Sequence, residues 1–147
     1  MDVVGRKKYR RTKRLNEDKI IEYILVNKEL NMGVGKIAGQ VAHVQTLIDN
    51  EVKFYADHHH SSKLPPAPEE WVQRLEWYEE WFLLDRAQTK VILRAKEKDL
   101  RKAIEMGAFF IRDNGLTEIP AGSLTVVGFL PQPKSNLMSF TKKFQLL

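Results

Sequence analysis

The sequence predicts a single α/β domain in which helices flank both faces of a mixed four-stranded sheet, in an α/β/α three-layer arrangement. The chain has 147 residues, of which 43% are hydrophobic, which is enough for one core but too few for two ordinary domains. Short β-rich apolar runs are interspersed with longer segments of helical periodicity. A glycine-containing turn joins the first of these apolar runs to a helical segment.

The first strand is predicted at residues 20–26, because this run has the length and apolar content of a buried strand. A turn with Gly33 and Gly35 follows, and then a helix that extends to about Tyr55. Ligands of open α/β sheets bind at the carboxyl ends of the strands. The turn therefore lies where a binding site is expected.

Residues 57–68 are predicted to form a loop insertion, since they combine a polar run with three prolines. The three consecutive histidines, residues 58–60, suggest a metal site. Neighbouring side chains on a loop rarely converge on one ion without ligands from elsewhere. We therefore predict no metal site.

A second helix is predicted at residues 69–84. It has an aromatic face at helical spacing, which comprises Trp71, Leu75, Tyr78 and Phe82 and is extended by Trp77 and Trp81. Most of these rings are assigned to the core. The alternative for an exposed tryptophan is stacking on an RNA base.

The rest of the chain supplies three strands and a further helix. Strand patterns cover residues 89–95, 108–112 and 123–130, and a helix at 97–106 ends at Gly107. The link between the last two strands contains Asn114-Gly115 and Pro120-Ala121-Gly122, which favours an antiparallel return. A short helical turn near residues 136–140 precedes the tail, residues 144–147.

The net charge of +5 comes entirely from an amino-terminal arm, residues 1–19. The arm has eight Lys and Arg against three Asp and Glu, and the remainder has sixteen of each sign. It is too poor in apolar groups to fold alone, so we expect disorder. Such an arm can neutralise RNA phosphates, and a solubilising tail is the alternative. Its candidate phosphate ligands are Arg10, Arg11, Lys13 and Arg14.

The composition excludes several classes of protein. The absence of cysteine excludes disulfides and thiolate metal sites. No apolar run approaches the roughly 18 residues needed to cross a bilayer, and the charged start lacks the apolar stretch of a secretory signal. A cytoplasmic protein without a membrane partner is expected.

The helix after the glycine turn has a polar stripe that suggests a site. At about 100° per residue, Lys36, Gln40 and His43 fall on one stripe, and the apolar residues Ile37, Val41, Val44 and Ile48 lie roughly 100° away. A helix start with free backbone N–H groups and a lysine suits an anion, and Gly33 and Gly35 allow it to approach the main chain. The alternative is a solvated helix rim.

Several motifs occur together in a fixed order. They are Met32-Gly33 through His43, Gln88-Thr89-Lys90, Asp113-x-Gly115-x-Thr117, Gly122-x-x-Thr125 and the closing Leu146-Leu147. With these motifs, the chain resembles the archaeal/eukaryotic-type (type 2) peptidyl-tRNA hydrolases from about residue 21 to residue 147. We therefore take residues 20–147 as a hydrolase-like domain that follows the basic arm.

The resemblance implies an enzyme that hydrolyses the ester between peptide and tRNA in peptidyl-tRNA, releasing both, with no cofactor or metal. Asp113 would orient the water or accept its proton, and Thr117 and Thr125 would fix the geometry. Lys36 would stabilise the oxyanion or bind the terminal phosphate. Gln40 would hold the ester or the adenosine.

The remaining assignments have structural alternatives. His43 is a candidate proton shuttle, although a helix histidine near a core also serves as a structural hydrogen-bonding group. Gln88 and Lys90 would line the tRNA path, or simply end a strand edge. Asp113 also suits an Asx-turn over Asn114-Gly115, which is compatible with a catalytic role.

The chain departs from the usual family pattern at several positions: Val34 replaces a lysine, Asn114 an alanine and Glu118 a glutamine, and Phe144-Gln145 replaces a leucine-lysine pair. A carboxylate at residue 118 close to Asp113 would raise the pKa of one of them and repel phosphate. The competing hypothesis is therefore a tRNA- or ribosome-binding protein of reduced or no activity on the same scaffold. The ribosome is a further candidate partner through the arm, and a homodimer stays open.

Overall fold

The computed structural model describes residues 18–84, 88–115 and 118–147. These residues form two compact units. Unit 1 contains the described residues within 1–22, 51–90 and 130–142, and unit 2 contains those within 23–50, 91–129 and 143–147. The basic side chains Arg10, Arg11, Lys13 and Arg14 lie outside the described residues, as does Thr117.

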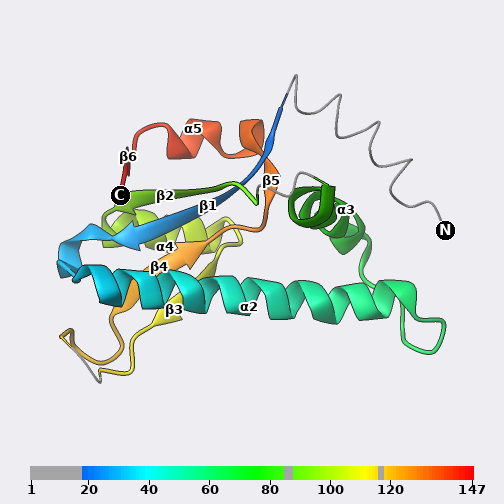
Figure 1. Ribbon diagram of the computed structural model, residues 1–147, viewed down its shortest axis with the longest axis horizontal. Coiled ribbons are helices and arrows are strands. Elements are labelled where there is room, and N and C mark those ends of the chain that lie inside the picture. Colours follow the sequence, from blue (N-terminus) through cyan, green and yellow to red (C-terminus); the bar gives the residue numbers. More distant parts are fainter. Residues whose placement is uncertain (1–17, 85–87, 116–117) are drawn as a thin grey trace. The chain divides into compact units, whose positions relative to one another are not determined.

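The α/β class is confirmed, and the strands form a mixed sheet in the order β3-β4-β1-β2-β6, with β5 paired to β1. Neighbours pair antiparallel in β1–β4, β3–β4, β2–β6 and β1–β5. The strands β1 and β2 run in the same direction (Figure 1). The strand bounds are β1 Ile20–Asn27, β2 Lys90–Ala95, β3 Phe109–Arg112, β4 Leu124–Gly128, β5 Gln132–Pro133 and β6 Gln145–Leu146.

Among the residues that the structure describes, the sheet has six strands instead of the predicted four. The two additional strands, β5 and β6, are only two residues long, and they come from segments that the sequence marked as a proline-containing break and a tail. A proline is tolerated in a strand where its missing N–H is not needed by the ladder, as at Pro133. The antiparallel return from β3 to β4 is confirmed.

The carboxyl end of β1 leads directly into the glycine turn. Asn27 is buried, and its amide nitrogen donates to the Leu124 carbonyl at 2.9 Å while its oxygen accepts from the Glu29 N–H at 3.0 Å. The second bond caps a 3₁₀ turn, η1 (Lys28–Leu30), and the left-handed Asn31 (φ 48°) then redirects the chain towards Gly33. Strand β1 thus fixes where the following helix begins.

In unit 2, helices cover both faces of β4. All five residues of this strand are buried. The helix α2 (Val34–His60) packs closely at Gly128, where an added Cβ would lie 3.0 Å from Ile48 Cδ1 and 3.2 Å from Val44 Cγ2. The helix α4 (Glu97–Glu105) also packs on β4, and it ends at Gly107 with φ 100°, as predicted.

The end of α2 in unit 1 corrects the predicted loop. The helix continues through His60 instead of ending near Tyr55, so residues 57–60 of the predicted loop 57–68 are helical. The ring of His58 lies 4.6 Å from that of Phe54, and its Nδ1 lies 2.9 Å from the Pro65 carbonyl oxygen. Histidines in a last turn also suit the negative end of the helix dipole.

The second predicted helix is confirmed, with a change of geometry at its end. It comprises α3 (Glu69–Glu79) and a π-helical turn, η2 (Glu80–Leu84). A π turn holds an extra residue, so Trp81 turns inward with 1% exposure whereas Phe82 is 42% exposed. The Trp81 indole N–H donates to the Thr89 carbonyl at 2.9 Å. Trp71 and Trp81 are core residues, as the sequence favoured.

The chain ends in short elements. In unit 1, η3 (Lys134–Asn136) and α5 (Met138–Thr141) confirm the predicted helical turn, and the Ser135 N–H donates to Asp18 at 3.0 Å.

Within residues 18–84, 88–115 and 118–147, no group of three or more His, Cys, Asp or Glu is placed to hold a metal ion. No helix of this described part has the length and apolar character to span a membrane.

Candidate active site

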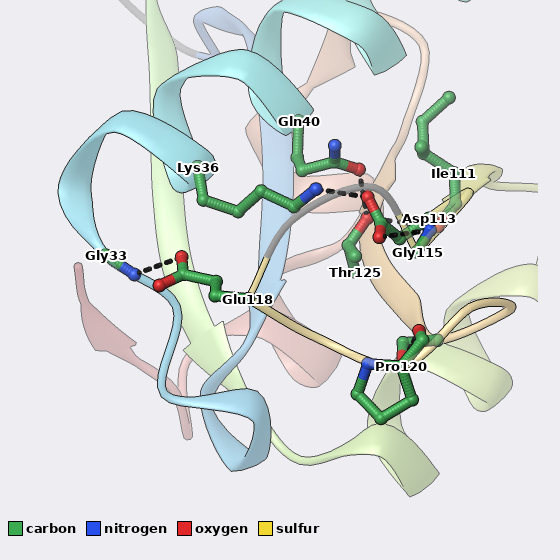
Figure 2. A network of polar contacts seen from close by, with 10 residues as sticks. Gly33, Lys36, Gln40, Ile111, Asp113, Gly115, Glu118, Pro120 and Thr125 are labelled. Carbon is green, nitrogen blue, oxygen red and sulfur yellow. Dashed lines mark hydrogen bonds and ion pairs between the residues drawn. The ribbon is translucent and has the colours of Figure 1, made fainter.

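The centre of the site is an ion pair between Lys36 and Asp113. Lys36 is the third residue of α2, and Asp113 follows β3 directly. The Lys36 ammonium group donates to Asp113 Oδ1 (Figure 2). The side chains are 12% and 5% exposed, respectively, so solvent screens this pair far less than a surface pair.

Backbone bonds fix the position of Asp113. Its N–H donates to the Ser123 carbonyl at 2.9 Å, and its carbonyl accepts from the Gly122 N–H at 2.7 Å. Its second carboxylate oxygen, Oδ2, accepts from the Gly115 N–H at 2.7 Å, which confirms the predicted Asx-turn. Gly115 is required there, because its φ is 76° and an added Cβ would lie 2.6 Å from the Ala121 Cβ.

The contacts of Asp113 hold its pKa below the ordinary value of 3.8. The hydrogen bond from Lys36 is the largest cause, and the Gly115 N–H and the Lys36 charge act in the same direction. Burial opposes them but does not prevail. Asp113 is therefore a carboxylate at neutral pH, and it is a weaker proton acceptor than an ordinary aspartate.

Gln40 and Thr125 form a second polar pair beside the first. Thr125 is fully buried on β4, and its Oγ1 lies 2.6 Å from Gln40 Oε1 and 3.1 Å from the Ile111 carbonyl oxygen. One hydroxyl proton can serve only one of these acceptors at a time. In the described part of the chain the NH₂ group of Gln40 has no hydrogen-bond partner, so it is free to donate to a ligand.

The glycine turn differs from the expected anion site. The Gly33 N–H donates to Glu118 Oε1 at 2.9 Å, so a carboxylate of the chain itself already occupies that amide (Figure 2). The predicted rise in the pKa of one of the two carboxylates, conditional on their being close, is not found at Asp113: its pKa is lowered, mainly by the hydrogen bond from Lys36, and Glu118 is not among the causes. The sequence gives no signal for the Gly33–Glu118 contact or for the contact between Thr125 and the Ile111 carbonyl. Both contacts depend on tertiary structure.

The other predicted site residues are not joined to these two pairs. His43 is exposed on α2, and no hydrogen bond connects it to another described residue. Gly35 is exposed in the first turn of α2, with open space where a Cβ would lie. Gln88 and Lys90 belong to unit 1, where Gln88 has a left-handed φ of 44° and Lys90 Nζ lies 4.7 Å from the Trp81 ring centroid.

An α/β fold with a shielded lysine–carboxylate pair, next to a free amide donor, has the groups that hydrolytic enzymes use on esters. The family model described as "Peptidyl-tRNA hydrolase PTH2" matches residues 20–147. The chain belongs to this family of hydrolases, as its motifs indicated.

Curated archaeal relatives support the assignment, and each of them is called a peptidyl-tRNA hydrolase. The protein of Sulfolobus acidocaldarius is 34% identical over 131 residues, which covers 84% of this chain and 97% of the relative. That of Saccharolobus solfataricus is 33% identical, with 84% and 96% covered. That of Staphylothermus marinus is 31% identical, with 86% and 93% covered. The family match begins at residue 20, so the basic arm lies outside it.

Proposed function

We propose that this chain hydrolyses the ester bond between peptide and tRNA in peptidyl-tRNA, with Lys36, Gln40, Asp113 and Thr125 as its active site. Family membership supplies the reaction and the substrate. The observation that supports this location is the shielded Lys36–Asp113 pair, since the two residues lie 77 positions apart and meet away from solvent. A buried ion pair is costly unless its geometry is good, which makes a functional role worth testing.

The reaction needs a positioned water and a stabilised oxyanion. Water adds to the ester carbonyl carbon and gives up one proton. The resulting tetrahedral oxyanion collapses by breaking the bond to the terminal ribose oxygen, which takes up that proton. In our proposal Lys36 stabilises the oxyanion. The lowered pKa of Asp113 makes it a poor base, so of its two expected roles we favour orienting the water and holding Lys36 over accepting a proton.

Gln40 and Thr125 orient the substrate in this scheme. Thr125 holds Oε1 of Gln40, which leaves the amide NH₂ to donate to the ester carbonyl or to the terminal adenosine. Thr117 keeps the geometric role that the resemblance gives it, although it lies outside the described residues. His43 stays a candidate proton shuttle on the exposed side of α2. None of these steps uses a metal or a cofactor.

Further contacts with the tRNA complete the proposal. We assign Gly33, Gly35, Gln88 and Lys90 to the path of the tRNA, in line with the family resemblance. The arm would bind phosphates through Arg10, Arg11, Lys13 and Arg14, with tRNA or the ribosome as its partner. In this proposal the protein acts in the cytoplasm, where tRNA is recycled, and a homodimer is compatible with it.

The test is the release of labelled peptide from an N-blocked aminoacyl-tRNA in EDTA, by the intact protein and by Lys36→Ala and Asp113→Ala. We expect both substitutions to abolish turnover while the proteins still bind tRNA. The control is Lys102→Ala, which removes an exposed lysine of α4 and should stay active.

The competing hypothesis predicts a different result. A non-catalytic binder would hold tRNA but release no peptide even as the intact, folded protein. No feature of the described residues favours that hypothesis, and peptide release that survives both substitutions would show that the site lies elsewhere.

A further inference from the structure

We propose that Glu118 is a positioning residue of this active site: it fixes the first turn of α2 and thereby holds Lys36 against Asp113. This inference rests on the proposed function, since it concerns the placement of the proposed catalytic lysine. It is carried by the hydrogen bond from the Gly33 N–H to Glu118 Oε1 and by the bonds that connect the segment 118–123 to Asp113.

The start of α2 lacks its own cap. The Gly33 carbonyl accepts the first helical hydrogen bond, from the Ile37 N–H at 3.0 Å, so Gly33 stands at the N-cap position. Glycine has no side chain to cap the helix. In a capping box, a Glu or Gln three residues later accepts from the N-cap N–H, but here that position is occupied by Lys36, which has no acceptor.

Glu118 supplies the missing acceptor from 85 residues away in the sequence. Its Oε1 lies 2.9 Å from the Gly33 nitrogen, where the acceptor of a capping box would lie. The first turn of α2 contains no acidic residue, so this carboxylate also places a negative charge at the positive end of the helix dipole. Lys36, which cannot accept that bond, turns towards Asp113 (Figure 2).

The segment that carries Glu118 is itself bound to Asp113. Ile119 is buried, and Ser123 donates through both its N–H and its hydroxyl to the Pro120 carbonyl, at 3.2 and 2.7 Å. The Ser123 carbonyl in turn accepts from the Asp113 N–H at 2.9 Å. One short segment thus holds the lysine's helix through Glu118 and the aspartate through Ser123, so the two ends of the ion pair share one support.

The contact requires a hydrogen-bond acceptor but not a charge. The amide oxygen of glutamine accepts the same bond, whereas alanine cannot. The test therefore compares Glu118→Ala with Glu118→Gln in the full chain. The control Glu105→Gln removes an exposed carboxylate that pairs with Lys102 on α4. For each protein we would measure kcat and KM for peptide release, the pH dependence of kcat/KM, and the unfolding temperature.

For Glu118→Ala we expect kcat to fall about tenfold or more, because small displacements of a catalytic group are costly. The change in KM should be smaller. The acid limb of the pH profile should move to higher pH, because Asp113 loses part of the stabilisation from Lys36. Glu118→Gln and Glu105→Gln should stay within about twofold of the intact protein. If Glu118→Ala does not fold, Glu118→Met keeps the side-chain length without an acceptor and replaces it.

Two results would overturn the proposal. One is an intact kcat and pH profile in Glu118→Ala, and the other is a Glu118→Gln variant as slow as Glu118→Ala. Failure of the proposed function looks different, since then either the intact protein would release no peptide or Lys36→Ala would stay active. A dead Lys36→Ala beside a fully active Glu118→Ala contradicts only the role of Glu118.

Discussion

The single carboxylate of Asp113 makes two different contacts. One oxygen closes the Asx-turn with the Gly115 N–H, and the other receives the Lys36 ammonium group. These bonds stabilise the ionised form, and they account for a pKa below the usual value despite burial. The same contacts that fix the geometry of the turn therefore keep the charge in place.

The lowered pKa of Asp113 predicts how stability depends on pH. The folded state favours the ionised form, so the contribution is fully present above the unfolded pKa of about 3.8 and is lost as pH falls through the lower folded pKa. Urea unfolding at neutral pH and near pH 3 should show a smaller acid loss in Asp113→Asn than in the intact protein. Equal losses in both proteins would contradict the lowered pKa.

Thr125→Val tests the second polar pair. The substitution removes a fully buried hydroxyl and leaves Gln40 Oε1 and the Ile111 carbonyl without their partner, which costs about 1–3 kcal/mol. We expect lower thermal stability and a lower kcat. The matched control is Thr141→Val, which removes the hydroxyl bond to the Leu137 carbonyl in unit 1 and should lower stability without lowering kcat. Equal kcat values in the two variants would rule out the role proposed for Thr125.

At the scale of elements, the turn between β3 and β4 shapes the site, and its glycines have different constraints. Gly115 and Gly122 both have a positive φ, of 76° and 82°. A Cβ at Gly115 would collide with Ala121, whereas one at Gly122 meets nothing within 4 Å. The strain of a left-handed residue is common to both positions, but the clash is confined to Gly115.

This difference predicts unequal effects of alanine. Gly122→Ala should cost about 1 kcal/mol of unfolding free energy, from backbone strain alone. Gly115→Ala should cost about 2–4 kcal/mol, since the clash adds to the strain, and it should also slow peptide release by moving the amide that holds Asp113. Chemical denaturation and turnover assays check both effects. The prediction fails if Gly122→Ala is the more damaging change.

The sequence was informative where signals are local. Strand β1, the start of α2 and the Asx-turn at Asp113 follow from short patterns, and the resemblance to a family named the four residues that meet in the site. The end of α2 was misplaced because prolines and histidines resemble a loop, whereas the helix continues to His60. The inward turn of Trp81 depends on a π-helical turn, and the Gly33–Glu118 contact on the tertiary fold. Neither has a signature in the sequence.

At the scale of the whole molecule, the family match and the net charge lie in different parts of the chain. The match covers residues 20–147, and the excess positive charge belongs to residues 1–19. In our proposal, the hydrolysis belongs to residues 20–147 and the general attraction to RNA phosphates belongs to the arm. This separation makes the contribution of the arm measurable without altering the proposed site.

Replacing Arg10, Arg11, Lys13 and Arg14 by Gln tests the arm. We expect weaker tRNA binding and a flatter dependence of affinity on salt, by about 0.7–0.9 in the log–log slope for each phosphate that the arm no longer neutralises. The kcat at saturating substrate should stay unchanged. Filter binding across a salt series, with turnover measured in parallel, checks this. An unaltered slope would show that the arm does not bind the tRNA.

The central claim is that Lys36 and Asp113 act as one catalytic unit, and a double-substitution cycle tests it most directly. Peptide release under single-turnover conditions would be measured for the intact protein, Lys36→Met, Asp113→Asn and the double variant. If the two residues act as a unit, the double variant should be little slower than the slower single variant. Rate reductions that multiply in the double variant would show that the two residues act independently and would contradict the claim.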